Sequence, residues 1–118
     1  MNRIEIKPLS VNEVWQGRRF KSPKYKAYEQ EVLYTLPAKW WVQAKSNDDL
    51  KGKKLMLFLK FGLSSKNADI DNPVKPLTDC LQKKYGFNDK QIYKLIVEKE
   101  IVKKKEEFIE FRITILAD

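Results

Sequence analysis

Apolar and polar positions alternate along this chain with two periods, one typical of strands and the other of helices. Residues 3–7 place isoleucines between charged residues, which predicts a short, half-buried strand. The apolar run within residues 53–62 predicts a buried strand, and residues 91–101 and 107–116 predict two more. Because only a lysine-rich turn separates the last two strands, we expect them to form a hairpin.

A first helix is predicted where apolar residues recur three or four positions apart, from residue 24 to about residue 44. These residues are Tyr25, Tyr28, Val32 and Leu36. Pro37 follows them directly, and a proline must end or kink a helix. The chain beyond Pro37 is therefore expected to change direction.

A second helix is predicted from the apolar positions Val74, Leu77, Leu81 and Tyr85, which fall on one helical face. Asn72 is expected to cap this helix, with Pro73 at its first position and Gly86 as its stop. Pro76 would then stand at the fourth helical position. There it would remove the first intrahelical hydrogen bond, so the regular helix is expected to start near Pro76.

The predicted order of elements is β-α-β-α-β-β. A chain of 118 residues has room for one hydrophobic core, so residues 1–118 are expected to form a single domain. We expect a small α/β domain of the α+β type, in which two helices cover a mixed four-stranded sheet.

Composition removes several kinds of chemistry. Histidine is absent, which excludes catalytic triads and metal sites that need an imidazole, and a single cysteine excludes an intrachain disulfide. No apolar run approaches the length of a signal-peptide core or a membrane span. We therefore expect a cytoplasmic protein. The 24 basic and 16 acidic residues give a net charge of +8, which suits a polyanionic partner.

Residues 18–26 concentrate this positive charge. The five basic residues of the segment are Arg18, Arg19, Lys21, Lys24 and Lys26, and no acidic residue interrupts them. Phe20, Tyr25 and Tyr28 are interleaved with or follow them and could pack on sugars or bases. The segment favours nucleic-acid binding over the alternative of a solvated basic loop.

Asp69 and Asp71 are the best candidates for metal chemistry. In extended backbone, residues two apart point to the same side, which would pair these carboxylates and turn Ile70 into the core. Mg²⁺ would relieve the repulsion between the two charges. Asp89 is a third carboxylate that could join them if strand 91–101 lies beside strand 53–62, and Lys75 could hold a phosphate. The alternative is that the acids are turn and cap residues and that Lys75 pairs with Asp79 on the surface.

Several sequence blocks resemble those of one nuclease family. They are DIDNPVK at 69–75, DCL at 79–81 and GFNDKQI at 86–92, with weaker blocks PLSVN at 8–12 and RRFK at 18–21. In residue type and order they are similar to the RusA family of Holliday-junction resolvases, endodeoxyribonucleases common in prophages. The chain departs from the family pattern at Asn88, where an acid is frequent, and at residues 67–68, where arginines are frequent.

This resemblance implies roles for individual residues. It implies Asp69, Asp71 and Asp89 as ligands of Mg²⁺ and Lys75 as the partner of the phosphate. The DNA-binding residues that we expect are Asn12, Arg18, Arg19, Lys21, Lys24 and Lys66. The resemblance also implies a homodimer that acts on branched DNA during recombination and repair.

We therefore expect a metal-dependent, structure-selective endodeoxyribonuclease that resolves four-way junctions by paired symmetric cuts. Two alternatives stay open at this point: a non-catalytic nucleic-acid-binding module, and an inactive homologue that still binds junctions. Trp40 and Trp41 follow Pro37, and adjacent side chains cannot share one face of a regular element. One indole is therefore expected at a dimer interface, unless it lies flat on the surface.

Overall fold

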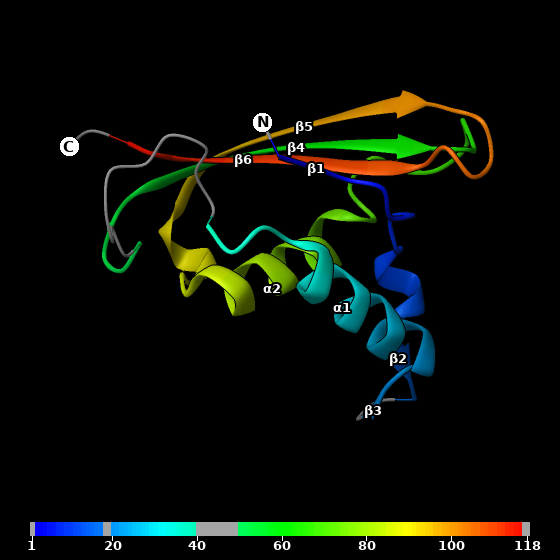
Figure 1. Ribbon diagram of the computed structural model, residues 1–118, viewed down its shortest axis with the longest axis horizontal. Coiled ribbons are helices and arrows are strands. Elements are labelled where there is room, and N and C mark those ends of the chain that lie inside the picture. The colour runs from blue at the N-terminus through cyan, green and yellow to red at the C-terminus, as the bar shows by residue number, and fades with distance from the viewer. Residues whose placement is uncertain (1, 18–19, 40–49, 117–118) are drawn as a thin grey trace.

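The computed structural model describes residues 2–17, 20–39 and 50–116. Figure 1 shows two helices beneath a four-stranded sheet, with a small two-stranded ribbon farther from the sheet. The strands are β1 (Asn2–Ile4), β2 (Trp15–Gln16), β3 (Phe20–Lys21), β4 (Leu55–Leu63), β5 (Ile92–Ile101) and β6 (Phe108–Ile115), the helices are α1 (Pro23–Thr35) and α2 (Val74–Tyr85), and the 3₁₀ turns are η1 (Val11–Glu13) and η2 (Asp89–Gln91). The predicted α+β class with a mixed four-stranded sheet and two helices is confirmed, and the β2–β3 ribbon is an addition to it.

The strand order in the main sheet is β1-β6-β4-β5. β4 runs parallel to β5 and antiparallel to β6, and β1 runs antiparallel to β6. The predicted hairpin between residues 91–101 and 107–116 is therefore wrong, because β4 lies between these two strands. The connection between them passes the end of β4, where the Val102 N–H donates to the Leu63 carbonyl at 2.9 Å.

The core lies between the sheet and the two helices. Every second residue of β4 is almost fully buried on the helical side, where Leu57, Leu59 and Phe61 pack. On α1 the predicted apolar face is confirmed, because Tyr25, Tyr28 and Val32 are all buried. Leu77, Leu81 and Cys80 of α2 are fully buried in the same core. The helical spacing in the sequence therefore identified the packed faces of both helices.

The boundaries of α1 differ from the prediction. Ser22 caps the helix by accepting a hydrogen bond from the Tyr25 N–H, and the helix ends at Thr35. Leu36 takes an extended backbone, as expected for a residue that precedes a proline. The expectation that Pro37 ends or kinks this helix is confirmed, and residues 40–44 of the predicted range lie outside the described residues. Trp40 and Trp41 lie outside the described residues.

The start of α2 also differs, by one residue. Pro73 occupies the N-cap position and Val74 is the first helical residue, so Asn72 does not cap the helix. Pro76 is therefore the third helical residue, whose N–H has no intrahelical partner in any α-helix. For this reason the helix is regular from Val74 rather than from Pro76. Gly86 ends it in the left-handed conformation, with a φ of 76°, as predicted.

One aromatic ring is buried on the face of the sheet that the helices leave open. Phe108 lies opposite Gly62 of β4 and is only 2% exposed. The guanidinium carbon of Arg3 lies 3.8 Å from the centroid of the Phe108 ring and covers it from the other side. The missing side chain at Gly62 makes the space for this ring.

Replacing Gly62 by alanine is expected to lower the free energy of unfolding by about 1–3 kcal/mol. A Cβ atom at this position would overlap with the ring of Phe108. Chemical denaturation measures the loss. In a Phe108→Ala background the same Gly62→Ala change should cost much less, and an equal cost in both backgrounds would contradict the proposed cause.

Candidate functional site

The segment that follows β4 forms consecutive turns and not an extended strand. The Asn72 N–H donates to the Asp69 carbonyl at 3.3 Å, and the Val74 N–H donates to the Asp71 carbonyl at 3.1 Å. Both aspartates are exposed. The expectation that Ile70 turns into the core is wrong, because the turn leaves this side chain 41% exposed.

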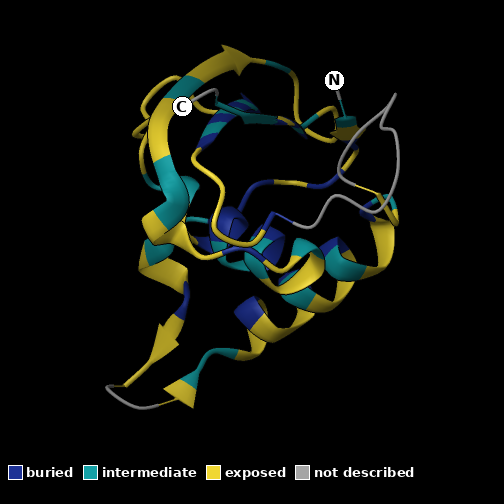
Figure 2. Cartoon of the chain, turned by 90° about the vertical axis from the view of Figure 1, so that its left-hand side faces the viewer, coloured by how far each residue is buried: buried dark blue, intermediate teal, exposed yellow. Residues whose placement is uncertain are grey.

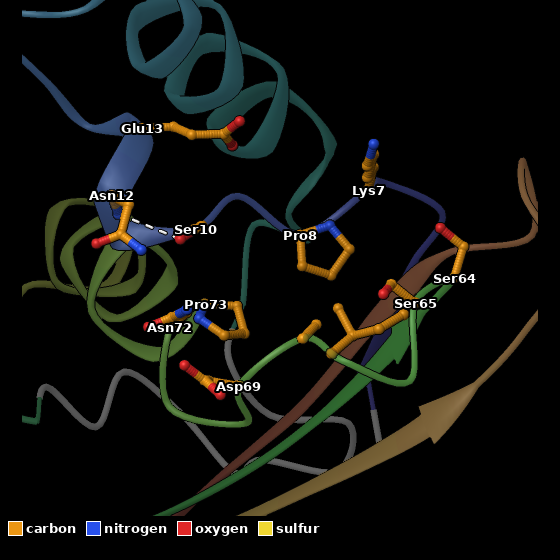
Figure 3. Close-up of a pocket in the computed structure, with 12 residues that line it drawn as sticks. Lys7, Pro8, Ser10, Asn12, Glu13, Ser64, Ser65, Asp69, Asn72 and Pro73 are labelled. Carbon is orange, nitrogen blue, oxygen red and sulfur yellow. Dashed lines mark hydrogen bonds between the residues drawn. The ribbon is translucent and has the colours of Figure 1, made fainter.

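The N-terminal loop packs against this turn and forms a pocket with it. The Val11 N–H donates to the Asn72 carbonyl at 2.8 Å. Ser10 and Asn12 from the loop, and Asp69 and Asn72 from the turn, line a pocket of about 400 Å³. Figure 3 shows the two segments facing each other across it. The structure thus brings together Asn12 and Asp69, which the sequence places in separate blocks.

A second cluster of charged side chains lies on α2. Lys75 places its Nζ 2.8 Å from Oδ1 of Asp79 and 3.6 Å from Oδ2 of Asp89. The Asp89 N–H donates to Oε1 of Gln82 at 2.9 Å, which ties Asp89 to the helix. β5 does lie beside β4, which was the condition for Asp89 to join Asp69 and Asp71. The ion pair that Asp89 makes in the structure is with Lys75.

The surroundings of Lys75 favour its charged form. The hydrogen bond to Asp79 raises the pKa of the Lys75 ammonium, and the charges of Asp79 and Asp89 add to this against a smaller lowering by desolvation. Lys75 is thus a fixed cation between two carboxylates. Its side chain is still more than half exposed, so an anionic ligand can reach it.

The three predicted metal ligands occupy two parts of this region. Asp69 lines the pocket, Asp71 lies in the exposed turn, and Asp89 lies beside Lys75. Within the described part of the chain, no three acidic, cysteine or histidine side chains form a group that could hold a metal ion. Metal ligation by these three residues stays a prediction.

The polar residues around Asp89 also stabilise the fold. Asn88 accepts a hydrogen bond from the Lys90 N–H, and Gln91 accepts one from the Asn88 N–H, so the two residues form a capping box around η2. The Gln91 amide also donates to the carbonyls of Leu50 and Lys53. Asn88 and Gln91 therefore hold the turn that positions Asp89.

Aromatic and basic side chains meet on the β2–β3 ribbon. The Nζ of Lys21 lies 4.2 Å from the ring centroid of Trp15 and 4.6 Å from that of Tyr25. Trp15 is 51% exposed and Phe20 is 71% exposed. Figures 1 and 2 both show the ribbon projecting away from the sheet. The ribbon thus combines exposed aromatic rings with a positive charge.

The other predicted DNA-binding residues differ in their surroundings. Lys24 forms an ion pair with Glu13 at 2.8 Å, which offsets part of its charge. Lys66 is exposed in the turn after β4, where its carbonyl accepts a hydrogen bond from Lys99. Arg18 and Arg19 lie outside the described residues.

Sequence reasoning missed two members of these groups, Trp15 and Gln82. Trp15 precedes the basic segment in the sequence and comes close to it only because β2 pairs with β3. The available signal for this ribbon was Gly17, a residue type that favours turns, which follows β2 with a φ of 72°. Asp79 was considered as a surface partner of Lys75, and this ion pair is present in the structure. Gln82 stands three residues after Asp79, at a spacing that places both on one side of the helix, and this was the available signal.

These features define the class of protein. It is a small basic α+β domain with exposed aspartates, a lysine held in ion pairs with two carboxylates, and a ribbon that carries aromatic and basic side chains. The chain matches the family model described as Endodeoxyribonuclease RusA over residues 7–114, and it belongs to this family. The match includes every predicted site residue, and membership implies nuclease activity on DNA junctions.

No curated protein matches the chain. Among the described residues, none of the helices is long and apolar enough to cross a membrane.

Proposed function

We propose that this protein is a metal-dependent, structure-selective endodeoxyribonuclease that resolves four-way DNA junctions by paired symmetric cuts. Residues 1–118 would act as one RusA-like nuclease domain, in the cytoplasm. The observation that carries the proposal is Lys75, held between Asp79 and Asp89 in a chain whose family is an endodeoxyribonuclease family. A cation beside exposed carboxylates can stabilise the charge that develops on a phosphate while the carboxylates hold a metal ion, which suits phosphodiester hydrolysis.

The proposed metal is Mg²⁺, with Asp69, Asp71 and Asp89 as its ligands. The donors fit this ion in kind, because Mg²⁺ takes carboxylate oxygens and commonly binds through one or two of them together with water and substrate phosphates. The three carboxylates do not form a single group in the isolated chain, so the DNA phosphate is expected to complete the set. When bound, the ion supplies Lewis acidity and offsets charge on the phosphate.

The residues of the chain have separate tasks in this proposal. Lys75 binds the scissile phosphate and stabilises the negative charge that builds on it during in-line attack. Asp79 positions the ammonium of Lys75, and Gln82 positions Asp89. Asn12, at the rim of the pocket that contains Asp69, contacts the DNA arm beside the cut.

Binding of the junction is proposed to involve both the ribbon and the turn after β4. The basic contacts are Arg18, Arg19, Lys21, Lys24 and Lys66. Trp15 and Phe20 are exposed enough to stack on bases that are unpaired at the branch point. A homodimer supplies two active sites, which the two symmetric cuts require.

A cleavage assay on a synthetic four-way junction tests the function. Paired cuts are expected with Mg²⁺ and not with EDTA, and a linear duplex should stay intact. Junction binding without cleavage under all metal conditions would favour the inactive homologue. Equal binding to junction and duplex without cleavage would favour a general nucleic-acid-binding module.

Removing the positive charge of residues 18–21 is expected to weaken junction binding and reduce its salt dependence. Each lost phosphate contact lowers the slope of log affinity against log salt by roughly 0.9. The triple variant Arg18→Ala, Arg19→Ala, Lys21→Ala is measured by titration at several salt concentrations. The matched control replaces Lys103, Lys104 and Lys105, and an equal effect of both triple variants would show that net charge alone matters.

A further inference from the structure

β5 forms the outer edge of the sheet, and among the described residues no other strand pairs with this edge. β5 spans ten residues at the end of the strand order. Figure 2 shows that most of the strand is exposed, and two of its apolar side chains, Tyr93 and Leu95, are 67% and 48% exposed. β4 beside it has no exposed residue. Proteins usually keep edge strands short or cover them, because an open edge can pair with another chain.

The side chains of β5 alternate between the two faces of the sheet. Its pairing with β4 places Lys94, Ile96 and Glu98 on the open face, next to Met56, Phe58 and Lys60. Leu95 and Val97 point to the helical face, next to Leu57 and Leu59. Charged residues of opposite sign thus stand two positions before and two positions after Ile96.

We propose that β5 pairs antiparallel with β5 of a second copy of this chain, about a twofold axis at Ile96. This inference rests on the homodimer of the proposed function and names its interface. In this register Lys94 lies opposite Glu98 of the second copy, and Leu95 lies opposite Val97 of the second copy. Each contact occurs twice because the twofold contact is isologous. Opposite charges and apolar pairs that face each other across strands are stabilising.

Neighbouring registers do not match. The twofold axis of such an antiparallel pair is perpendicular to the sheet. Residues that lie opposite each other across the axis therefore have their side chains on the same face of the sheet. This is possible only if the axis passes between two copies of the same residue, which is called the centre of the register. A centre at Leu95 puts Lys94 opposite Ile96 of the second copy. A centre at Val97 puts Ile96 opposite Glu98 of the second copy. Of these three centres, only Ile96 pairs the residues within two positions of the axis so that apolar faces apolar and each charge faces its opposite.

The geometry has a consequence for the active sites. Because the axis is normal to the sheet, the helices of both copies lie on the same side of one continuous eight-stranded sheet. The turns at residues 69–75 leave the sheet on that helical side (Figure 1). Both sites therefore face the same side of the dimer, where one junction can contact both of them.

Charge reversal tests the register. Glu98→Lys places like charges opposite each other twice, and we expect the dimer to dissociate about tenfold more readily in sedimentation equilibrium. The double variant Lys94→Glu, Glu98→Lys restores both pairs and should recover the wild-type dissociation constant. Glu31→Lys on α1 is the matched control and should change nothing. A dimer unaffected by Glu98→Lys, or not recovered by the double variant, would overturn this interface.

Cross-linking gives an independent test. Ile96→Cys places two thiols at the axis, and a thiol-specific bifunctional maleimide with a short spacer should convert most of the protein to a covalent dimer. Arg112→Cys, on the open face of β6 and away from the edge, should stay monomeric on a denaturing gel. The native Cys80 is buried, and burial raises the pKa of its thiol to about 12, so it gives little background.

The outcomes separate the interface from the function. A wild-type dimer that cuts junctions but neither cross-links at Ile96→Cys nor responds to Glu98→Lys would refute this interface and leave the nuclease intact. A wild-type chain that stays monomeric at micromolar concentration would refute both the interface and the dimer. Dimerisation through β5 without cleavage would support the interface and refute the proposed activity.

Discussion

Replacing Asp71 by asparagine is expected to reduce the rate of junction cleavage by at least about 10³-fold and to preserve junction binding. A metal ligand contributes several kcal/mol to the stabilisation of the transition state, and each 1.36 kcal/mol is a factor of ten in rate. The amide also removes a negative charge that repels DNA, so affinity for the junction should be equal or higher. Single-turnover cleavage and a gel-shift titration measure the two effects separately.

The control for this variant is Glu31→Gln, which makes the same carboxylate-to-amide change on the exposed surface of α1. It should cleave at the wild-type rate. An Asp71→Asn protein that cleaves at a similar rate would refute the metal-ligand assignment. Loss of binding together with cleavage would instead point to a structural role of the turn at residues 69–73.

Replacing Lys75 by methionine is expected to lower the cleavage rate about 10²–10³-fold, the usual loss when one preorganised donor to a developing charge is removed. Methionine keeps the length of the aliphatic part and removes only the ammonium. Binding should weaken much less, because the junction makes many other phosphate contacts. Lys75→Arg should recover part of the rate, since the positive charge is restored.

Lys83→Met is the matched control for Lys75. Lys83 also lies on α2 and also pairs with a carboxylate, Glu29, at 2.9 Å. Its removal takes away the same charge from the same helix but at the other end. Equal rate losses for the two variants would show that Lys75 acts through the charge or stability of the helix and not at the phosphate.

Local patterns in the sequence were sufficient to predict the elements of the fold but not the order of its strands. The helical faces of α1 and α2 follow from apolar spacing, because each helix buries one side in the same core. The position of β5 does not follow from such a pattern. The turn between β5 and β6 has the composition of a hairpin, and the insertion of β4 between them depends on long-range packing.

The site was predictable in composition more than in geometry. Asp69, Asp71 and Lys75 were found from their spacing in one short segment. Their backbone conformation was not predicted correctly. Backbone hydrogen bonds from Val11 to Asn72 and from Asn72 to Asp69 hold this segment in a turn, where extended backbone was expected. The contact between Asp89 and Lys75 joins residues 14 positions apart and depends on a hydrogen bond from Asp89 to Gln82, so it follows from the tertiary structure and not from the spacing within one segment.

The position of β6 in the sheet affects how the chain can fold while it is being synthesised. β6 lies between β1 and β4, so Arg3 finds its partner Glu110 only after almost the whole domain has left the ribosome. Until then β1 and the inner edge of β4 lack their neighbour, and the apolar side chains of β4 are only partly covered. Contacts between distant parts of a chain slow folding, so this nuclease should fold after translation of β6 and depend on chaperones more than a helical protein of similar size does.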